Sequence, residues 1–139
     1  MTQAHIFPVT IYYEDTDITG LVYHPNYFKY FERARSEFFD GEKLRRMQHE
    51  DGIGVAVYKA EIMFKKGAVL GDRLEIHSRP EIQGDYRIVF NQQVFRAGQN
   101  ALLVEAKVEL VCISQEKLVR MSQWIVDRVE SFKNEQFTA

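Results

Sequence analysis

The stretch from Pro25 to Phe39 reads P-N-Y-F-K-Y-F-E-R-A-R-S-E-F-F and decides the fold class. Its large apolar residues recur every three or four positions, which is the spacing of one helix face. These positions are Tyr27, Tyr30, Phe31, Ala34, Phe38 and Phe39. Pro25 suits the first helical position, where its missing N–H would have no partner anyway. The pattern predicts one long amphipathic helix early in the chain.

Extended segments surround this helix. Val9, Ile11 and Tyr13 alternate with polar residues, which predicts a first strand. After the helix, alternation and turn signals such as Gly84-Asp85 predict consecutive antiparallel strands. We place them at residues 53–66, 74–82, 87–96 and 104–112. One long apolar helix with such a series of strands predicts an α+β fold in which an antiparallel β-sheet wraps around a long central α-helix.

Length and composition limit the classes of protein to consider. With 139 residues, the chain fits a single domain over 1–139. The 18 basic and 20 acidic residues give a net charge of −2, so we do not expect a nucleic-acid partner. No apolar run approaches the roughly 20 residues of a membrane-spanning helix, so we expect no stable membrane insertion. The single cysteine, Cys112, and the lack of a signal peptide predict a reduced, cytoplasmic protein with a buried structural thiol.

The segment from Tyr12 to Tyr27 carries the chemistry. It reads Y-Y-E-D-T-D-I-T-G-L-V-Y-H-P-N-Y and crowds Glu14, Asp15 and Asp17 against the start of the predicted helix. Carboxylates this close repel one another, and closing a loop does not require them. The helix start also offers unpaired backbone N–H groups and the positive end of a dipole. The segment therefore predicts a functional site, with Asp15 in a structural role.

Three motifs together resemble a known enzyme family. They are D-T-D-x-x-G-x-V-Y-H-x-x-Y, Y-F-E-R-A-R and F-K-K-G-A-V-L-G-D-x-L-E-I. The chain resembles the hotdog-fold acyl-CoA thioesterases of the 4-hydroxybenzoyl-CoA thioesterase superfamily, and within them the YbgC-like branch, over residues 9–126. The resemblance implies a hotdog fold and hydrolysis of a small acyl-CoA to free acid and CoA. Short aliphatic acyl groups are favoured, and aryl groups stay open. No cofactor is implied, because coenzyme A is part of the substrate.

The resemblance also implies roles for individual residues. The catalytic carboxylate maps onto Asp17, which could attack the thioester carbon as a nucleophile or activate water as a general base. The backbone N–H of His24 is the implied oxyanion donor. Its ring either assists catalysis, which we favour, or only fills space at the helix start. The expected substrate-binding residues are Tyr13, Gly20, Val22, Tyr23, Tyr27, Lys65 and Lys66. From the residues alone, Tyr13 fits an ordinary strand equally well, and the lysine pair is either a solvated face or a place to meet the phosphates of coenzyme A.

Partners and competing functions complete the expectations. An open sheet edge predicts a homodimer, and the resemblance implies pairing of dimers into a homotetramer, with Asp17 of one subunit facing residues 55–63 of the other. We expect no metal site, because His5, His49 and His77 lack ligand spacing. Acyl carrier protein is a second candidate partner. The alternatives are a hydratase or dehydratase on the same fold, and a non-catalytic module that binds acyl carrier protein or another partner.

Overall fold

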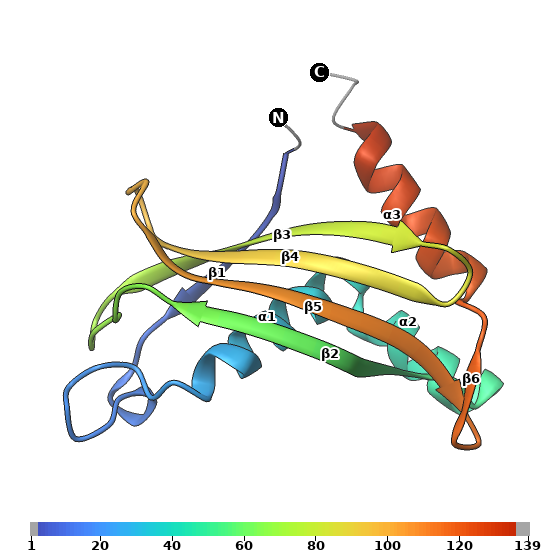
Figure 1. The fold of residues 1–139 in the computed structure, drawn as a ribbon, viewed down its shortest axis with the longest axis horizontal. Helices are drawn as coiled ribbons and strands as arrows, with labels where there is room; N and C mark the ends of the chain where they lie inside the picture. Colours follow the sequence, from blue (N-terminus) through green and yellow to red (C-terminus); the bar gives the residue numbers. More distant parts are fainter. Residues whose placement is uncertain (1–2, 136–139) are drawn as a thin grey trace.

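The computed structural model of the protein describes residues 3–135. The strands are β1 (His5–Thr10), β2 (Gly54–Phe64), β3 (Arg73–Gln83), β4 (Arg87–Arg96), β5 (Leu102–Ser114) and β6 (Lys117–Val119). The helices are α1 (Asn26–Phe39), α2 (Gly41–Arg46) and α3 (Gln123–Glu135), with short helical turns η1 (Tyr13–Asp15) and η2 (Met47–Asp51). All strand pairs are antiparallel, in the order β1-β3-β4-β5-β2, with β6 added to β5. Figure 1 shows the sheet passing across α1, which confirms the predicted α+β hotdog fold.

The aromatic face of α1 forms the core against the sheet. Tyr30, Phe31 and Phe38 are each 1% exposed. Phe38 meets the ring of Phe90 on β4 edge-on at 5.6 Å between centroids, and the ring of Phe132 on α3 at 5.2 Å. Burying aromatic side chains of this size is a dominant source of folding free energy. The predicted helix is therefore correct, although it begins at Asn26 rather than at Pro25.

The first strand lies earlier in the chain than predicted. The prediction of a strand through Tyr13 is wrong, because β1 ends at Thr10 and η1 follows. Asp15 closes this turn, since its Oδ2 accepts the N–H of Tyr12 at 2.8 Å and its Oδ1 accepts the hydroxyl of Tyr30 at 2.7 Å. Burial and this contact with Asp15 raise the pKa of Tyr30, so the hydroxyl keeps its proton. Asp15 thus has the structural role that we predicted.

Strand β2 forms an edge of the sheet. In the described part of the chain it pairs with β5 alone. Its large side chains are exposed, with Tyr58 at 61%, Met63 at 56% and Phe64 at 46%. A long edge strand with unpaired backbone groups and exposed apolar side chains is a surface to which another strand can add.

A polar network lies inside the core between α1 and the sheet. The Nη1 of Arg35 donates to the Oε1 of Gln92 at 3.0 Å. The Nε2 of Gln92 donates to the carbonyl of Phe31 at 3.1 Å and to the hydroxyl of Ser78 at 2.9 Å. Gln92 and Ser78 are 0% exposed, and Arg35 is 8% exposed. The position of each amide atom is therefore fixed by its own partners.

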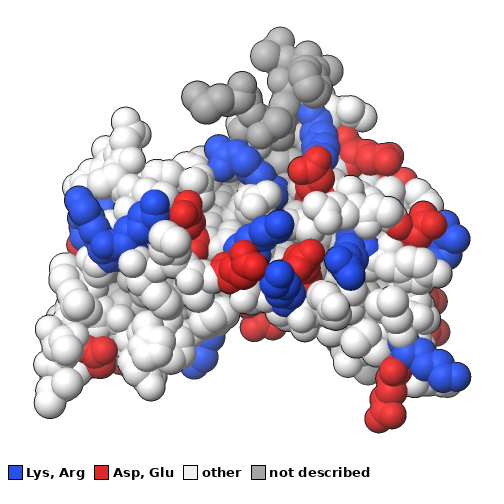
Figure 2. Space-filling view, viewed as in Figure 1, with Lys and Arg blue, Asp and Glu red and all other residues white. Residues whose placement is uncertain are grey.

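The charged surface has no dominant sign. Figure 2 shows basic and acidic side chains interspersed over the face of the molecule that it presents, without a continuous field of either sign. Between residues 3 and 135, no helix has the length and apolarity that crossing a membrane requires.

Candidate active site

Asp17 begins a tight hairpin loop. Its backbone N–H donates to the carbonyl of Leu21 at 2.9 Å, and its carbonyl accepts the N–H of Gly20 at 3.0 Å. Gly20 has a φ of +83°, a conformation that residues with a Cβ rarely adopt. A Cβ at Gly20 would meet no atom within 4 Å, so this glycine is explained by its backbone conformation rather than by crowding.

The carboxylate of Asp17 is held through one of its two oxygens. Oδ1 accepts the backbone N–H of Thr19 at 2.8 Å and also the hydroxyl of Thr19. Among residues 3–135, Oδ2 has no hydrogen-bond partner. The Thr19 hydroxyl, the Thr19 N–H and the charge of His24 lower the pKa of Asp17. The side chain is therefore ionised at neutral pH, with its second oxygen available.

The start of α1 leaves one backbone donor unused near this loop. The N–H groups of Asn26, Tyr27 and Phe28 donate to the carbonyls of Tyr23, His24 and Pro25 at 2.9, 3.3 and 3.1 Å. By contrast, no described residue accepts the N–H of His24. This N–H stands just ahead of the helix, where the backbone dipoles favour negative charge.

A pocket of about 290 Å³ joins the Asp17 loop to the start of α1 and the end of β2. Its walls are formed by Asp17, Thr19, Leu21, Val22, His24, Tyr27, Phe64, Lys65, Lys66 and Gly67. Six of the nine predicted site residues line it, namely Asp17, Val22, His24, Tyr27, Lys65 and Lys66. The fold thus places an acid, an unused backbone donor and two cations around one cavity.

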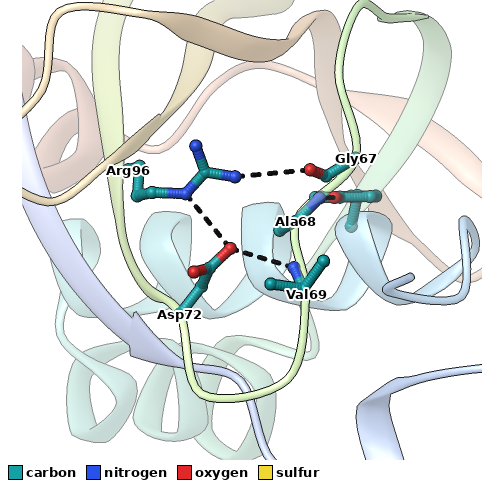
Figure 3. Close-up of polar contacts among 6 residues, drawn as sticks. Gly67, Ala68, Val69, Asp72 and Arg96 are labelled. Carbon is teal, nitrogen blue, oxygen red and sulfur yellow. Dashed lines mark hydrogen bonds and ion pairs between the residues drawn. The ribbon is translucent and has the colours of Figure 1, made fainter. Parts of the chain in front are cut away.

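The wall formed by residues 65–72 is fixed by an ion pair. The Nε of Arg96 lies 3.1 Å from the Oδ2 of Asp72, which also accepts the N–H of Val69 at 2.9 Å. The Nη2 of Arg96 donates to the carbonyl of Gly67 at 3.4 Å, so one side chain connects the loop to β4 (Figure 3).

The same wall is joined to the Asp17 loop. The carbonyl of Ala68 accepts the N–H of Val22 at 2.9 Å, and Leu21 forms a β-bridge with Val69. A Cβ on Gly67 would lie 2.9 Å from the Cδ2 of Leu21, so this glycine leaves room for a side chain that is 41% exposed.

Three predicted residues lie outside the pocket walls. Tyr13 is 82% exposed on η1, and Gly20 turns the hairpin. Tyr23 is 49% exposed, and its ring packs edge-on against the ring of His24 at 5.2 Å. Their contacts with substrate stay predictions, as do the catalytic roles of Asp17 and His24.

The two predicted phosphate-binding lysines have different surroundings. Lys65 lies 3.6 Å from the Oε1 of Glu105, and its side chain is 44% exposed. Lys66 has no ion-pair partner in the part of the chain that the structure describes, and its side chain is also exposed. Lys66 is therefore the freer cation at the pocket rim.

Sequence reasoning did not single out four residues of the wall, Thr19, Leu21, Phe64 and Gly67. Thr19 follows Asp17 by two positions, and this spacing is a known signal for a hydrogen bond to an aspartate side chain. Phe64 and Gly67 reach the pocket because the end of β2 lies beside the Asp17 loop, and Leu21, within that loop, is placed by its bridge to Val69. Their positions depend on tertiary structure, which no local pattern encodes.

The described residues 3–135 contain neither a metal-binding cluster nor an accessible thiol. Residues 3–135 contain no group of three His, Cys, Asp or Glu side chains placed to hold a metal ion. Cys112 is 0% exposed and donates to the Sδ of Met121 at 3.5 Å, and burial raises the pKa of its thiol. Cys112 is therefore the buried structural thiol that we predicted.

Comparison with known proteins places the chain in a family. The profile described as "Thioesterase-like superfamily" matches residues 12–129. "Acyl-CoA thioester hydrolase YbgC" of Escherichia coli O6:H1 is 34% identical over 113 residues, which cover 81% of this chain and 84% of that protein. "Acyl-CoA thioesterase YbgC" of Helicobacter pylori (strain 26695) is 39% identical over 107 residues, which cover 77% of this chain and 78% of that protein. The crystal structure of Slr0204, a 1,4-dihydroxy-2-naphthoyl-CoA thioesterase from Synechocystis, superposes with a TM-score of 0.84 over 91% of this chain and 95% of that one. Its 22% identity shows the common fold alone. The chain therefore belongs to the thioesterase-like superfamily and, within it, to the YbgC group.

Proposed function

We propose that this protein hydrolyses acyl-CoA thioesters, with Asp17 as the catalytic carboxylate and the backbone N–H of His24 as the oxyanion donor. One observation carries the proposal. The ionised Asp17 keeps Oδ2 without a partner, and it shares a pocket with His24, whose N–H is also unused. Membership of the YbgC group supports the choice of a CoA thioester as substrate.

Two routes fit this geometry. In the first, Oδ2 of Asp17 attacks the carbonyl carbon, the C–S bond breaks, CoA leaves as a thiolate, and water then opens the mixed anhydride. In the second, Oδ2 accepts a proton from a water molecule that attacks the carbonyl carbon directly, and the C–S bond of the tetrahedral intermediate then breaks, so that CoA leaves as a thiolate. Both routes create negative charge on the thioester oxygen. A preorganised N–H donor to that oxygen typically contributes about two to three powers of ten in rate, which is the role we give to His24.

Release of free CoA thiol tests the proposal. Acetyl- to palmitoyl-CoA and benzoyl-CoA are offered to the wild type, Asp17→Asn and Asp17→Ala. We expect both variants to lose activity by orders of magnitude while their circular dichroism stays that of the wild type. Glu14→Gln is the matched control, because Glu14 is an acid of the same loop that does not line the pocket. Hydrolysis that is indifferent to Asp17 would contradict the mechanism, and no hydrolysis of any ester would favour the partner-binding alternative.

Substrate and assembly form the finer part of the proposal. We propose a small acyl group, because the pocket of about 290 Å³ is also shared with the thioester and two lysines. We propose a homodimer through the exposed edge of β2, with further pairing of dimers into a tetramer. Acyl carrier protein as a partner and a cytoplasmic location belong to the same proposal. Light scattering and activity measured along a dilution series test the dimer, since an active monomer would contradict a shared site.

A further inference from the structure

Arg35 is a buried cation that forms no ion pair with any described residue. It is 8% exposed, and the one hydrogen bond that the described residues offer it is to the neutral amide oxygen of Gln92, at 3.0 Å. Across residues 3–135, no carboxylate forms an ion pair with it. The side-chain amide of Gln92 is fixed in this orientation, because its Nε2 donates to the carbonyl of Phe31 and to the hydroxyl of Ser78. The other N–H groups of the guanidinium therefore have no acceptor in the described chain.

Solvent reaches the guanidinium nitrogens that have no acceptor, because Nδ1 of His5 is the only side-chain nitrogen or oxygen among the described residues that is both sealed from solvent and unpaired. A mostly buried charge is normally paired, so a cation that is open on one side is a candidate binding group for an anion. Burial lowers the pKa of Arg35 to about 10, so the guanidinium still carries its charge at neutral pH. Glu32 lies close enough to raise that pKa, but it is an exposed side chain and does not reach Arg35.

Arg35 faces a pocket that is distinct from the Asp17 pocket. This second pocket has a volume of about 430 Å³ and lies between α1, α2 and the start of β2. Apolar walls come from Leu44, Val55 and Leu110, and polar groups come from Ser36 and Arg45. Arg45 is paired with Glu42 at 3.5 Å, so Arg35 is the cation of this pocket that has no ion-pair partner among the described residues. A planar guanidinium in a partly apolar pocket is suited to a carboxylate, which it can bind through two parallel hydrogen bonds.

We propose that Arg35 binds the distal carboxylate of the acyl group, so that the substrates include CoA monothioesters of dicarboxylic acids. This inference rests on the proposed function and on pairing through the β2 edge. The Arg35 pocket includes Gly54 and Val55 at the start of β2, and the Asp17 pocket includes Phe64 at its end. When two copies of β2 pair antiparallel, the end of one strand lies beside the start of the other. The Arg35 pocket of one subunit then opens beside the Asp17 pocket of its partner.

The kinetic test compares two acyl groups of four carbons, the succinyl group with a terminal carboxylate and the butyryl group with a terminal methyl. We expect the wild type to prefer succinyl-CoA in kcat/KM. Arg35→Met keeps the length of the side chain and removes the charge. It should lower the succinyl-to-butyryl ratio about 10- to 100-fold, because it removes a charge-assisted hydrogen bond. Arg35→Lys should keep part of the preference, because it keeps the charge but not the planar fork.

A control and a second variant separate binding from folding. Arg33→Met removes the same charge from an exposed position on α1 that lines neither pocket, so the ratio should stay that of the wild type. Ser36→Asp leaves Arg35 in place and adds a negative charge to the pocket wall. It should lower the ratio even if Arg35→Met fails to fold. An unchanged ratio in both pocket variants, or an equal loss in Arg33→Met, would overturn the proposal.

Calorimetry with free succinate gives a readout that does not need turnover. We expect binding to the wild type and to Arg33→Met, and at least tenfold weaker binding to Arg35→Met. If the wild type hydrolyses no thioester but binds succinate through Arg35, the proposed function fails and the carboxylate site stands. If succinate binds through Arg35 but succinyl-CoA is not preferred, the assignment to the acyl group is overturned. If succinate does not bind and thioesters are hydrolysed without preference, the whole inference is wrong and the proposed function stands.

Discussion

Replacing Gln92 by Leu removes three hydrogen bonds from the core and leaves a buried charge alone. The variant loses the acceptor for Arg35 and the donor to Phe31 and Ser78, whereas leucine has a similar volume and preserves packing. Losing a hydrogen bond to a charged group typically costs about 1.5–3 kcal/mol, and the carbonyl of Phe31 and the hydroxyl of Ser78 also lose a partner, so we expect a loss of about 2–4 kcal/mol. The whole domain is stabilised by about 5–15 kcal/mol, so this loss is a substantial share of its stability.

Equilibrium unfolding in urea at one fixed protein concentration measures this loss, since a dimer's stability depends on concentration. Gln93→Leu is the control on the next residue of β4, which lies on the opposite face of the sheet and accepts from Arg79 at 3.2 Å. We expect it to cost less than about 1 kcal/mol. Adding Arg35→Met to Gln92→Leu should recover part of the loss, because the double variant no longer buries an unpaired charge. A loss below about 1 kcal/mol for Gln92→Leu, or equal losses for Gln92→Leu and Gln93→Leu, would refute the reasoning.

Three further predictions concern pH and the pocket wall. Burial lowers the pKa of His5 below its ordinary 6.5, so the unfolded chain takes up the proton first and stability falls as the pH drops through and below about 6.5. The urea midpoint of His5→Asn should fall less over that window, and parallel profiles would contradict this. Thr19→Val removes a hydrogen bond to Asp17, so it should raise the pKa of Asp17 towards its ordinary 3.8. The acidic limb of kcat/KM against pH should then move to higher pH. A limb that does not move would be evidence against the role of Asp17. Gly67→Ala should lower the free energy of unfolding by less than about 1 kcal/mol, because the exposed methyl groups of Leu21 can move aside. A larger loss in urea unfolding would mean that the two loops are rigidly packed.

The sequence predicted best where one pattern acts alone. The spacing of large residues located α1 to within one residue, and alternation with clear turn signals located β4 correctly. The first strand was misplaced, because Asp15 closes a turn with the help of Tyr30, fifteen residues away. Helix α2 was not predicted. It begins after Asp40, whose side chain accepts the N–H of Glu42 as a helix N-cap, a signal that the sequence reading passed over, whereas its φ of +90° follows from no spacing rule.

The residues of the candidate site were also predicted only in part. The acids, the glycine and the histidine between residues 14 and 24 are close in sequence, so their pattern and the family resemblance identified Asp17 and His24 as candidates. Phe64 and Gly67 reach the pocket only because strand β2 ends beside the Asp17 loop. The lack of an ion pair at Arg35 could not be predicted either, since α1 also contains Glu32 and Glu37, and Glu32 lines the same pocket without pairing with Arg35.

The link between Arg96 and the loop of residues 65–72 has a consequence for biosynthesis. Asp17 and His24 are synthesised early, but the wall that faces them is held by a side chain that leaves the ribosome more than seventy residues later. A nascent chain that carries the acid and the backbone donor therefore has no finished pocket until β4 has joined the sheet. Unfinished chains would not hydrolyse cellular CoA esters, so the order of synthesis itself delays activity until the fold is nearly complete.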